Sequence, residues 1–145
     1  MFTISVITVT LNCEDTIEKT ILSVINQPYK NIEFIIIDGG SSDNTNEIIS
    51  KYKKNLACYI SEPDSGIYEA MNKGIRFSNG EGLIFLNAGD YFVGDVFYGI
   101  QFPSLIPVMY KNFFGKYVFA RLKIPFIGIP YCHQGIIFSK RNFTY

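Results

Sequence analysis

Two aspartates in this sequence could take part in binding chemistry, because each follows a short apolar run and lies close to a glycine. Asp38 follows Phe34–Ile37, and Asp90 closes a polar turn after Leu83–Leu86. A carboxylate is a hard oxygen ligand, so Asp90 could hold a divalent cation that bridges phosphates. Aspartate and glycine are also common in ordinary turns. The two residues therefore fit one shared site and two unrelated turns equally well.

A third polar segment, Thr10-Leu11-Asn12, follows a run of mostly β-branched residues. In open parallel sheets, ligands bind beyond the carboxyl ends of the strands. If the apolar runs are neighbouring parallel strands, Asn12, Asp38 and Asp90 lie at one edge of the sheet. The sequence has no Gly-x-Gly-x-x-Gly motif and no Gly-x-x-x-x-Gly-Lys-Ser/Thr motif, which argues against a standard dinucleotide site and a P-loop.

His133 is the only histidine and has Gln134 and Gly135 as its neighbours. A lone histidine is more often a packed or surface residue than a ligand, but these neighbours favour a polar turn, and imidazole suits manganese and related metals. The three cysteines are far apart and odd in number, so they predict neither a zinc site nor a disulfide framework. A reducing, cytoplasmic setting fits this pattern.

Strand and helix patterns alternate along the chain, which predicts an α/β fold with a mainly parallel central sheet. Asn12 is the expected cap of the first helix, and Gly74 is expected at the carboxyl end of the third. Beyond Asp95, four prolines interrupt the pattern. The expected elements are a strand at Ile4–Thr10, a helix containing Ile17–Ile25, a strand at Phe34–Ile37, a helix capped by Ser41–Asp43, a strand at Cys58–Ile60, a helix containing Ile67–Ile75 and a strand at Leu83–Leu86.

Composition limits the class of protein. The chain has 145 residues, of which 48% are hydrophobic and 18% are charged, so it predicts one folded domain and excludes intrinsic disorder. No apolar run reaches the roughly 18 residues of a membrane span. Met1–Thr10 predicts a first strand and not a secretion signal.

The formal net charge of zero conceals an uneven distribution. Residues 1–100 contain 7 basic and 13 acidic side chains, whereas residues 101–145 contain 6 basic side chains and no acidic one. A basic, aromatic segment of this kind fits contact with a polyanion or a membrane surface, and it equally fits packing against the acidic part of the chain or exposure to solvent. The neutral total and the lack of a recognition motif argue against a nucleic-acid partner.

Five segments together make the sequence similar to family 2 glycosyltransferases, and to a subset that acts in bacterial surface-polysaccharide assembly of the colanic-acid type. The resemblance covers about the first 92 residues and returns near residues 125–138. Ser61–Ile75 is the most specific of these matches. The matching segments are Ile4–Asn12 with Ile21–Gln27, Ile36–Thr45, Ser61–Ile75, Phe85–Asp90 and Cys132–Gln134.

The resemblance implies a GT-A fold and transfer of a sugar from a UDP- or GDP-sugar donor to a hydroxyl acceptor, with inversion. It implies Mn²⁺ or Mg²⁺, which would stabilise the charge that develops on the departing nucleoside diphosphate. A lipid-linked glycan is the implied acceptor, and a peripheral membrane contact through Phe113, Phe114, Lys116, Arg121 and Lys123 would suit it. The implied nucleotide-binding residues are Thr8, Val9, Thr10, Asn12, Asp38, Asp64, Asn72 and Asn87, and the implied metal ligands are Asp90 and His133.

The sequence departs from the family pattern in two places and lacks one expected group. Many members have an aspartate where this chain has Gly39 and another where it has Gly89. An inverting transferase also needs a general base, usually a carboxylate, which the family places after the His-Gln segment. The chain has no acidic residue after Asp95. We therefore expect one domain that is truncated at its carboxyl end, with a donor half at residues 1–95 and a partial acceptor half at 96–145, and the catalytic base remains unknown.

Three functions fit these observations. The first is an active glycosyltransferase, and the second is a non-catalytic nucleotide-sugar-binding remnant or partner subunit of the same fold. The third is a phospho-acceptor signalling domain, which also has an aspartate after a buried strand. That third function leaves Asp64–Gly74 and Asn87–Asp90 without a purpose, so it is the weakest of the three.

Overall fold

The computed structural model describes residues 2–94, 97, 107–111, 117–121 and 138–139. From Ile4 to Phe85 the chain alternates between strands and helices as the sequence predicts, and the described elements after Phe85 are strands. The elements are β1 (Ile4–Thr10), α1 (Ile17–Ile25), β2 (Ile32–Asp38), α2 (Thr45–Lys51), the 3-10 helix η1 (Lys53–Asn55), β3 (Cys58–Ser61), α3 (Ile67–Phe77), β4 (Gly82–Phe85), β5 (Tyr91–Phe92), β6 (Pro107–Lys111), β7 (Tyr117–Arg121) and β8 (Phe138–Ser139).

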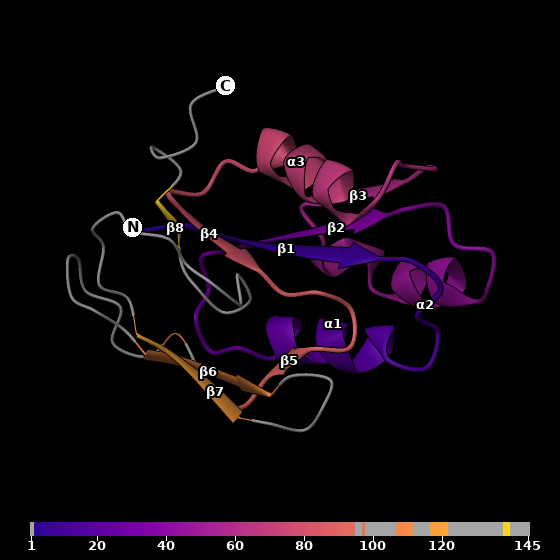
Figure 1. The fold of residues 1–145 in the computed structure, drawn as a ribbon. Coiled ribbons are helices and arrows are strands. Elements are labelled where there is room, and N and C mark those ends of the chain that lie inside the picture. The colour runs from indigo at the N-terminus through magenta and orange to yellow at the C-terminus, as the bar shows by residue number, and fades with distance from the viewer. Residues whose placement is uncertain (1, 95–96, 98–106, 112–116, 122–137, 140–145) are drawn as a thin grey trace.

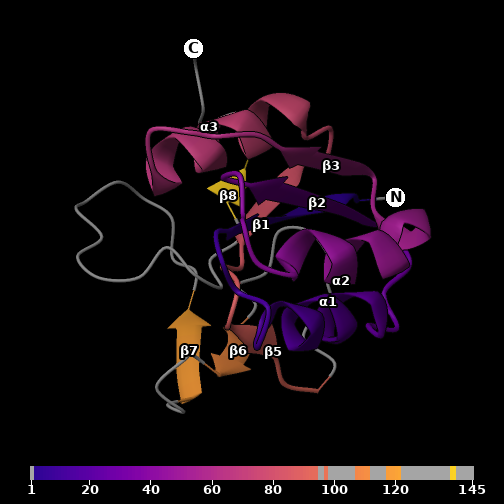
Figure 2. The same cartoon turned by 90° about the vertical axis from the view of Figure 1, so that its right-hand side faces the viewer.

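The central sheet has the strand order β3-β2-β1-β4-β8, and its first four strands are parallel. β8 joins the edge in the antiparallel direction. Helix α3 covers one face of the sheet, and α1 and α2 cover the other, so three layers are stacked (Figures 1 and 2). The prediction of an α/β sandwich with a mainly parallel sheet is confirmed.

The pattern of side chains on β1 explains these layers. All seven residues of β1 are buried, because helices cover both faces of this central strand. Ile4 and Val6 pack with the cluster under α1 and α2, and Ile7 and Val9 pack with the cluster under α3. The alternation of a β-strand thus divides the core into two apolar layers.

A second, antiparallel sheet contains β5, β6 and β7. β5 lies alongside α1 (Figure 1), so the chain leaves the central sheet after β4 and crosses to the α1 side. The part of the chain described here contains no helix that is long and apolar enough to cross a membrane.

Two local predictions are wrong. Asn12 does not cap α1, because the helix begins at Ile17 and Thr16 is its N-cap. Gly74 does not end α3, which continues to Phe77. A Cβ atom added to Gly74 would lie 2.3 Å from Cγ2 of Ile7, so this glycine allows the helix to pack closely on the sheet.

Candidate functional site

The carboxylate of Asp38 lies inside the protein and holds the loop that follows β2. The residue is 0% exposed. Its Oδ2 accepts hydrogen bonds from the Gly40 N–H at 3.2 Å, the Ser41 N–H at 2.9 Å and the Ser61 hydroxyl at 2.7 Å, and its Oδ1 accepts one from the Ser41 hydroxyl. These donors replace the water that burial removes. Asp38 therefore positions the loop, and its contact with a nucleotide base stays a prediction.

Asn12 connects this loop to the chain that leaves β1. Its N–H donates to the Ser41 hydroxyl at 2.8 Å, and its Oδ1 accepts the Ser42 N–H at 2.9 Å. Its φ is +50°, a left-handed conformation that asparagine adopts more readily than most residues. The carboxyl ends of β1 and β2 thus form one hydrogen-bonded surface, and Asn12 is an exposed part of it.

The carboxylate of Asp64, on the loop between β3 and α3, lies over Gly39. A Cβ atom added to Gly39 would be 3.0 Å from Oδ2 of Asp64 and 3.3 Å from its Cγ. Oδ1 of Asp64 accepts the Gly66 N–H at 2.8 Å, which fixes the carboxylate in this place. Many family members have an aspartate at the position of Gly39. In this chain, the carboxylate of Asp64 fills the space beside that glycine.

The chain after β4 forms a tight turn that ends at Asp90. The Asp90 N–H donates to the Asn87 carbonyl at 3.0 Å, and Gly89 has a φ of +97°. A positive φ at the third position is typical of a type II turn. Asp90 is only 4% exposed, and Oδ1 of Asn87 is buried without a hydrogen-bond partner among the described residues. A buried carboxylate and an unpartnered amide oxygen therefore belong to the same turn.

Thr8, Val9 and Thr10 are all buried in β1, with exposed fractions of 0%, 5% and 7%. The hydroxyl oxygens of the two threonines have no hydrogen-bond partner within the described part of the chain. Val9 packs with the apolar cluster under α3, and neighbouring side chains of a strand point to opposite faces. A ligand on one face of β1 would thus meet the threonine side chains or the valine side chain, but not all three.

Helix α3 carries the exposed Asn72 and a network of charges at its amino end. Nζ of Lys73 lies 2.8 Å from the Glu62 carboxylate and 3.3 Å from the Glu69 carboxylate. The Ser65 hydroxyl and N–H also donate to Glu69, and with Lys73 they lower the pKa of Glu69 to about 2. This network holds the loop that precedes α3 against the first turns of the helix.

Not every predicted site residue can be placed. His133 and the predicted membrane-contact residues Phe113, Phe114, Lys116 and Lys123 lie outside the described residues, and Arg121 is described only as part of the backbone of β7. Within the described ranges, no group of three or more His, Cys, Asp or Glu residues could hold a metal ion. Asp90 is therefore the predicted metal ligand whose surroundings are known.

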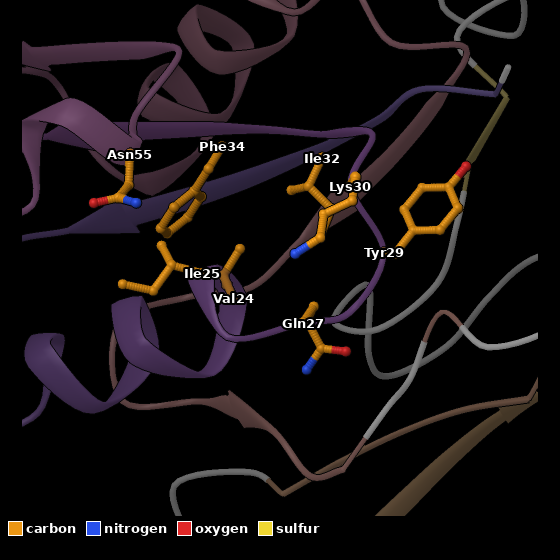
Figure 3. A pocket seen from close by; sticks show the side chains of 8 residues that line it. All are labelled: Val24, Ile25, Gln27, Tyr29, Lys30, Ile32, Phe34 and Asn55. Atoms are coloured by element: carbon orange, nitrogen blue, oxygen red, sulfur yellow. The ribbon is translucent and has the colours of Figure 1, made fainter.

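One pocket lies away from these loops, at the opposite end of the sheet. Ile32 and Phe34 of β2 line it together with Val24, Ile25 and Gln27 from α1 and the residues that follow it (Figure 3). Because Ile32 is the first residue of β2, the pocket is at the amino end of the strands. Ligands of open parallel sheets bind at the carboxyl end, so we do not assign the predicted site to this pocket.

Comparison with known proteins identifies the family. The family described as "Glycosyl transferase family 2" matches residues 5–101. The chain belongs to this family. An uncharacterized glycosyltransferase of Mycobacterium tuberculosis is 44% identical over 93 residues, which are 63% of this chain and 36% of that protein. The UDP-Glc:alpha-D-GlcNAc-diphosphoundecaprenol beta-1,3-glucosyltransferase WfaP of Escherichia coli is 38% identical over 91 residues, 62% of this chain and 36% of WfaP. The chain thus matches 36% of the length of these relatives.

Two solved structures share the fold of this chain. S. aureus TarS 1-349 in complex with UDP-GlcNAc has a TM-score of 0.58 and 27% identity, over 62% of this chain and 27% of that one. Glucosyl-3-phosphoglycerate synthase from Mycobacterium tuberculosis, in complex with Mn²⁺, UDP and phosphoglyceric acid, has a TM-score of 0.53 and 25% identity, over 62% and 34%. Both predictions, the family and the GT-A fold, are confirmed.

Sequence reasoning missed two parts of this edge. It did not find that Asp64 lies over Gly39, because 25 residues separate them and only the folded loops bring them together. It also did not find Thr20, whose hydroxyl contacts the backbone of the Gly89–Asp90 turn. The family resemblance includes Ile21–Gln27, next to Thr20, but a single sequence does not show which residues the polar side chains of a helix contact.

Proposed function

We propose that this chain binds a nucleotide-sugar donor at the carboxyl ends of β1, β2 and β4 and belongs to a sugar-transfer reaction. The main observation is the turn after β4, in which the buried carboxylate of Asp90 follows the buried amide oxygen of Asn87, which has no partner among the residues that the structure describes. A buried polar atom without a partner is unfavourable unless a ligand, ion or water satisfies it. Oxygen atoms in this arrangement suit a diphosphate and its counter-ion.

The donor set of this turn fits a hard divalent cation. Mg²⁺ and related ions are usually bound by one or two protein carboxylates, with substrate phosphates and waters completing the coordination. Asp90 would supply the carboxylate, Asn87 would supply an amide oxygen, and His133 is proposed near the same ion. Bound Mn²⁺ or Mg²⁺ would neutralise the charge that develops on the departing nucleoside diphosphate. The Mn²⁺ complex of glucosyl-3-phosphoglycerate synthase supports this proposal.

The remaining predicted residues would bind the nucleotide. Asn12 is exposed at the junction of the β1 and β2 loops, and Asp64 lies over Gly39 beside it. We assign the base and ribose of the nucleotide to this surface. Asp38 would act indirectly, by holding the loop after β2. Asn72 of α3 would contact the donor from the helix. From β1, either the Thr8 and Thr10 side chains or the Val9 side chain would line the floor, because they lie on opposite faces of the strand. UDP and GDP are both candidate nucleotides, and the UDP-GlcNAc complex of TarS favours UDP.

Fewer observations bear on the acceptor of the reaction than on the donor. The name of WfaP describes a diphosphoundecaprenol-linked sugar as acceptor, which supports a lipid-linked glycan as the acceptor here. A peripheral place on the cytoplasmic face of a membrane belongs to the same proposal, because such an acceptor is membrane-bound. An inverting transfer needs a base that takes the proton of the acceptor hydroxyl. No carboxylate is assigned to that role. A module that binds the donor without transferring the sugar is therefore the second candidate function, and residues 96–145 belong to the proposed acceptor half.

Calorimetric titration of the chain with UDP and then GDP, each with and without Mn²⁺, tests the donor site. We expect nucleotide binding that strengthens with Mn²⁺ and loses this strengthening in Asp90→Ala. Asp15→Ala is the matched control, because Asp15 is an exposed carboxylate on the loop before α1 and should leave binding unchanged. A folded chain that binds neither nucleotide would overturn the proposal. Sugar transfer to a lipid-linked acceptor distinguishes an enzyme from a binding module.

A further inference from the structure

Helix α1 presents a row of polar side chains to the backbone that follows the Asp90 turn. Thr20 and Ser23 of α1, and Gln27 two residues beyond its end, are spaced by three and four residues and lie in one row. Each forms a hydrogen bond with the segment of residues 89–94. β5, which is part of that segment, runs beside α1 in Figure 1.

Thr20 makes the bonds nearest to Asp90. Its hydroxyl accepts the Gly89 N–H at 3.0 Å and donates to the Asp90 carbonyl at 2.7 Å. Thr20 is 0% exposed, so no water competes for these partners. One hydroxyl group thus bonds to the backbone of both Gly89 and Asp90, once as an acceptor and once as a donor.

Ser23 and Gln27 continue the row toward the end of α1. The Ser23 hydroxyl accepts the Phe92 N–H at 3.1 Å and donates to the carbonyl of Thr20 at 2.7 Å. Nε2 of Gln27 donates to the Gly94 carbonyl at 3.0 Å. Gln27 also borders the pocket of Figure 3. Backbone groups at residues 89, 90 and 92 are therefore bonded to α1, and the one at residue 94 is bonded to Gln27 just beyond it.

Two further backbone hydrogen bonds hold the turn. The Asp90 N–H bonds to Asn87 within the turn, and the Ala88 N–H donates to the Val9 carbonyl at 3.1 Å. β4 has already ended at Phe85, so Gly89 and Asp90 are beyond the ladder of the central sheet. Thr20 supplies a contact that links the backbone of both residues to α1.

We propose that Thr20 is a positioning residue that fixes the Gly89–Asp90 backbone and thereby aims the Asp90 carboxylate at the donor diphosphate and its counter-ion. This inference rests on the proposed function of Asp90. Groups that orient a metal ligand typically change metal affinity by about 10-fold to 100-fold when they are removed. Replacing a residue that only fills the core would change nucleotide affinity equally with and without the metal.

The experiment compares Thr20→Val, Thr20→Ser and Ile75→Val with the wild-type chain. Valine keeps the shape of threonine and removes both hydrogen bonds, whereas serine keeps the hydroxyl. Ile75 is buried on α3, on the opposite face of the sheet, so Ile75→Val controls for general loss of stability. Calorimetry gives UDP and GDP affinity with and without Mn²⁺, and amide hydrogen exchange of the ligand-free protein reports on Gly89 and Phe92.

We expect Thr20→Val to lower the Mn²⁺-dependent affinity by about 10-fold or more while metal-free affinity stays close to the wild-type value. Thr20→Ser should restore the Mn²⁺ dependence, and Ile75→Val should not alter it. The Gly89 amide should exchange faster in Thr20→Val alone. Equal losses with and without Mn²⁺ would overturn the inference.

A wild-type chain that binds no nucleotide would contradict the proposed function and not the backbone contact. In that case hydrogen exchange still tests whether Thr20 fixes the Gly89–Asp90 backbone. A Gly89 amide in Thr20→Val that is as slow as in Ile75→Val would show that Thr20 does not fix the turn.

Discussion

Gly89 illustrates how one residue determines the shape of the candidate metal turn. Its φ of +97° is in the region that favours glycine, and a Cβ atom there costs roughly 1–2 kcal/mol. We expect Gly89→Ala to lower the free energy of unfolding by about 1 kcal/mol or more, measured by urea denaturation. Gly89→Asn should lose less, because asparagine tolerates a positive φ. Equal stability of Gly89→Ala and wild type would contradict this account of the turn.

The sequence predicts where the candidate site residues lie, but it does not predict what each of their side chains contacts. The types of Asn12, Asp38 and Asp90 and their places after strands were enough to predict that they share an edge, whereas Asp64 was expected in the donor site only from the family resemblance. Their individual roles depend on side-chain direction. Asp38 is buried under its own loop, and Asp64 fills the space over Gly39. A sequence pattern does not carry such directions, because they arise from contacts between segments far apart in the chain.

At the scale of elements, the contact between α3 and β1 depends on Gly74. A Cβ atom at this position would lie 2.3 Å from Cγ2 of Ile7, well inside normal contact distance. Overpacking costs about 1–3 kcal/mol and outweighs the roughly 1 kcal/mol that alanine gains in a helix. We therefore expect Gly74→Ala to destabilise the protein in urea unfolding.

Ile7→Leu provides the test of this cause, because leucine lacks the γ2 methyl group. In a double-mutant cycle, Gly74→Ala should cost less in the Ile7→Leu background than alone. Strictly additive losses would mean that the alanine acts elsewhere. The sequence predicted the helix correctly but not the function of Gly74, since a glycine near a helix end usually indicates a cap.

Glu33 connects three elements at the amino end of the sheet. Burial raises the pKa of its carboxyl, but hydrogen bonds from Ser5, Asn79 and Gly80 outweigh burial and leave the pKa below the ordinary 4.5. A carboxyl whose pKa is lower in the folded state stabilises the fold fully above its unfolded pKa and loses this effect as the pH falls through the folded pKa. Stability should therefore fall on acidification below about pH 4.5.

Glu33→Gln should be less stable than wild type at neutral pH, and the difference should shrink as the pH approaches about 3. Urea unfolding across this pH range measures it. Glu47→Gln is the control, because Glu47 is an exposed carboxylate on α2. A difference between Glu33→Gln and wild type that stays constant with pH would show that the charge of Glu33 does not stabilise the fold.

At the scale of the whole molecule, the order of the strands predicts an order of stability. β1 pairs with β2 on one side and β4 on the other and is buried throughout, whereas β3 pairs only with β2 and its residues are half-buried or exposed. We expect native-state hydrogen exchange to be slowest for the β1 amides and faster for β3, since protection follows burial and bonding. Equal protection of the two strands would contradict this order.

The three-layer architecture was predictable for a physical reason. Strands buried on both faces are continuous apolar runs, and amphipathic helices between them leave few alternatives to a parallel sheet. The second sheet of β5, β6 and β7 was not predicted, because its strands are short and the sequence around them, with prolines at 103 and 107, has no clear period. The predicted roles of residues 96–145, including His133, stay predictions.

The unpartnered hydroxyl of Thr8 has a consequence for how this sequence would evolve. A buried hydroxyl without a partner costs roughly 1–3 kcal/mol, and valine has nearly the same shape. A population of variants that is selected only for resistance to proteolysis should therefore drift toward valine at position 8, whereas Thr20, whose hydroxyl is fully bonded, should persist. Sequencing such a population separates what natural selection has kept for folding from what it has kept for binding.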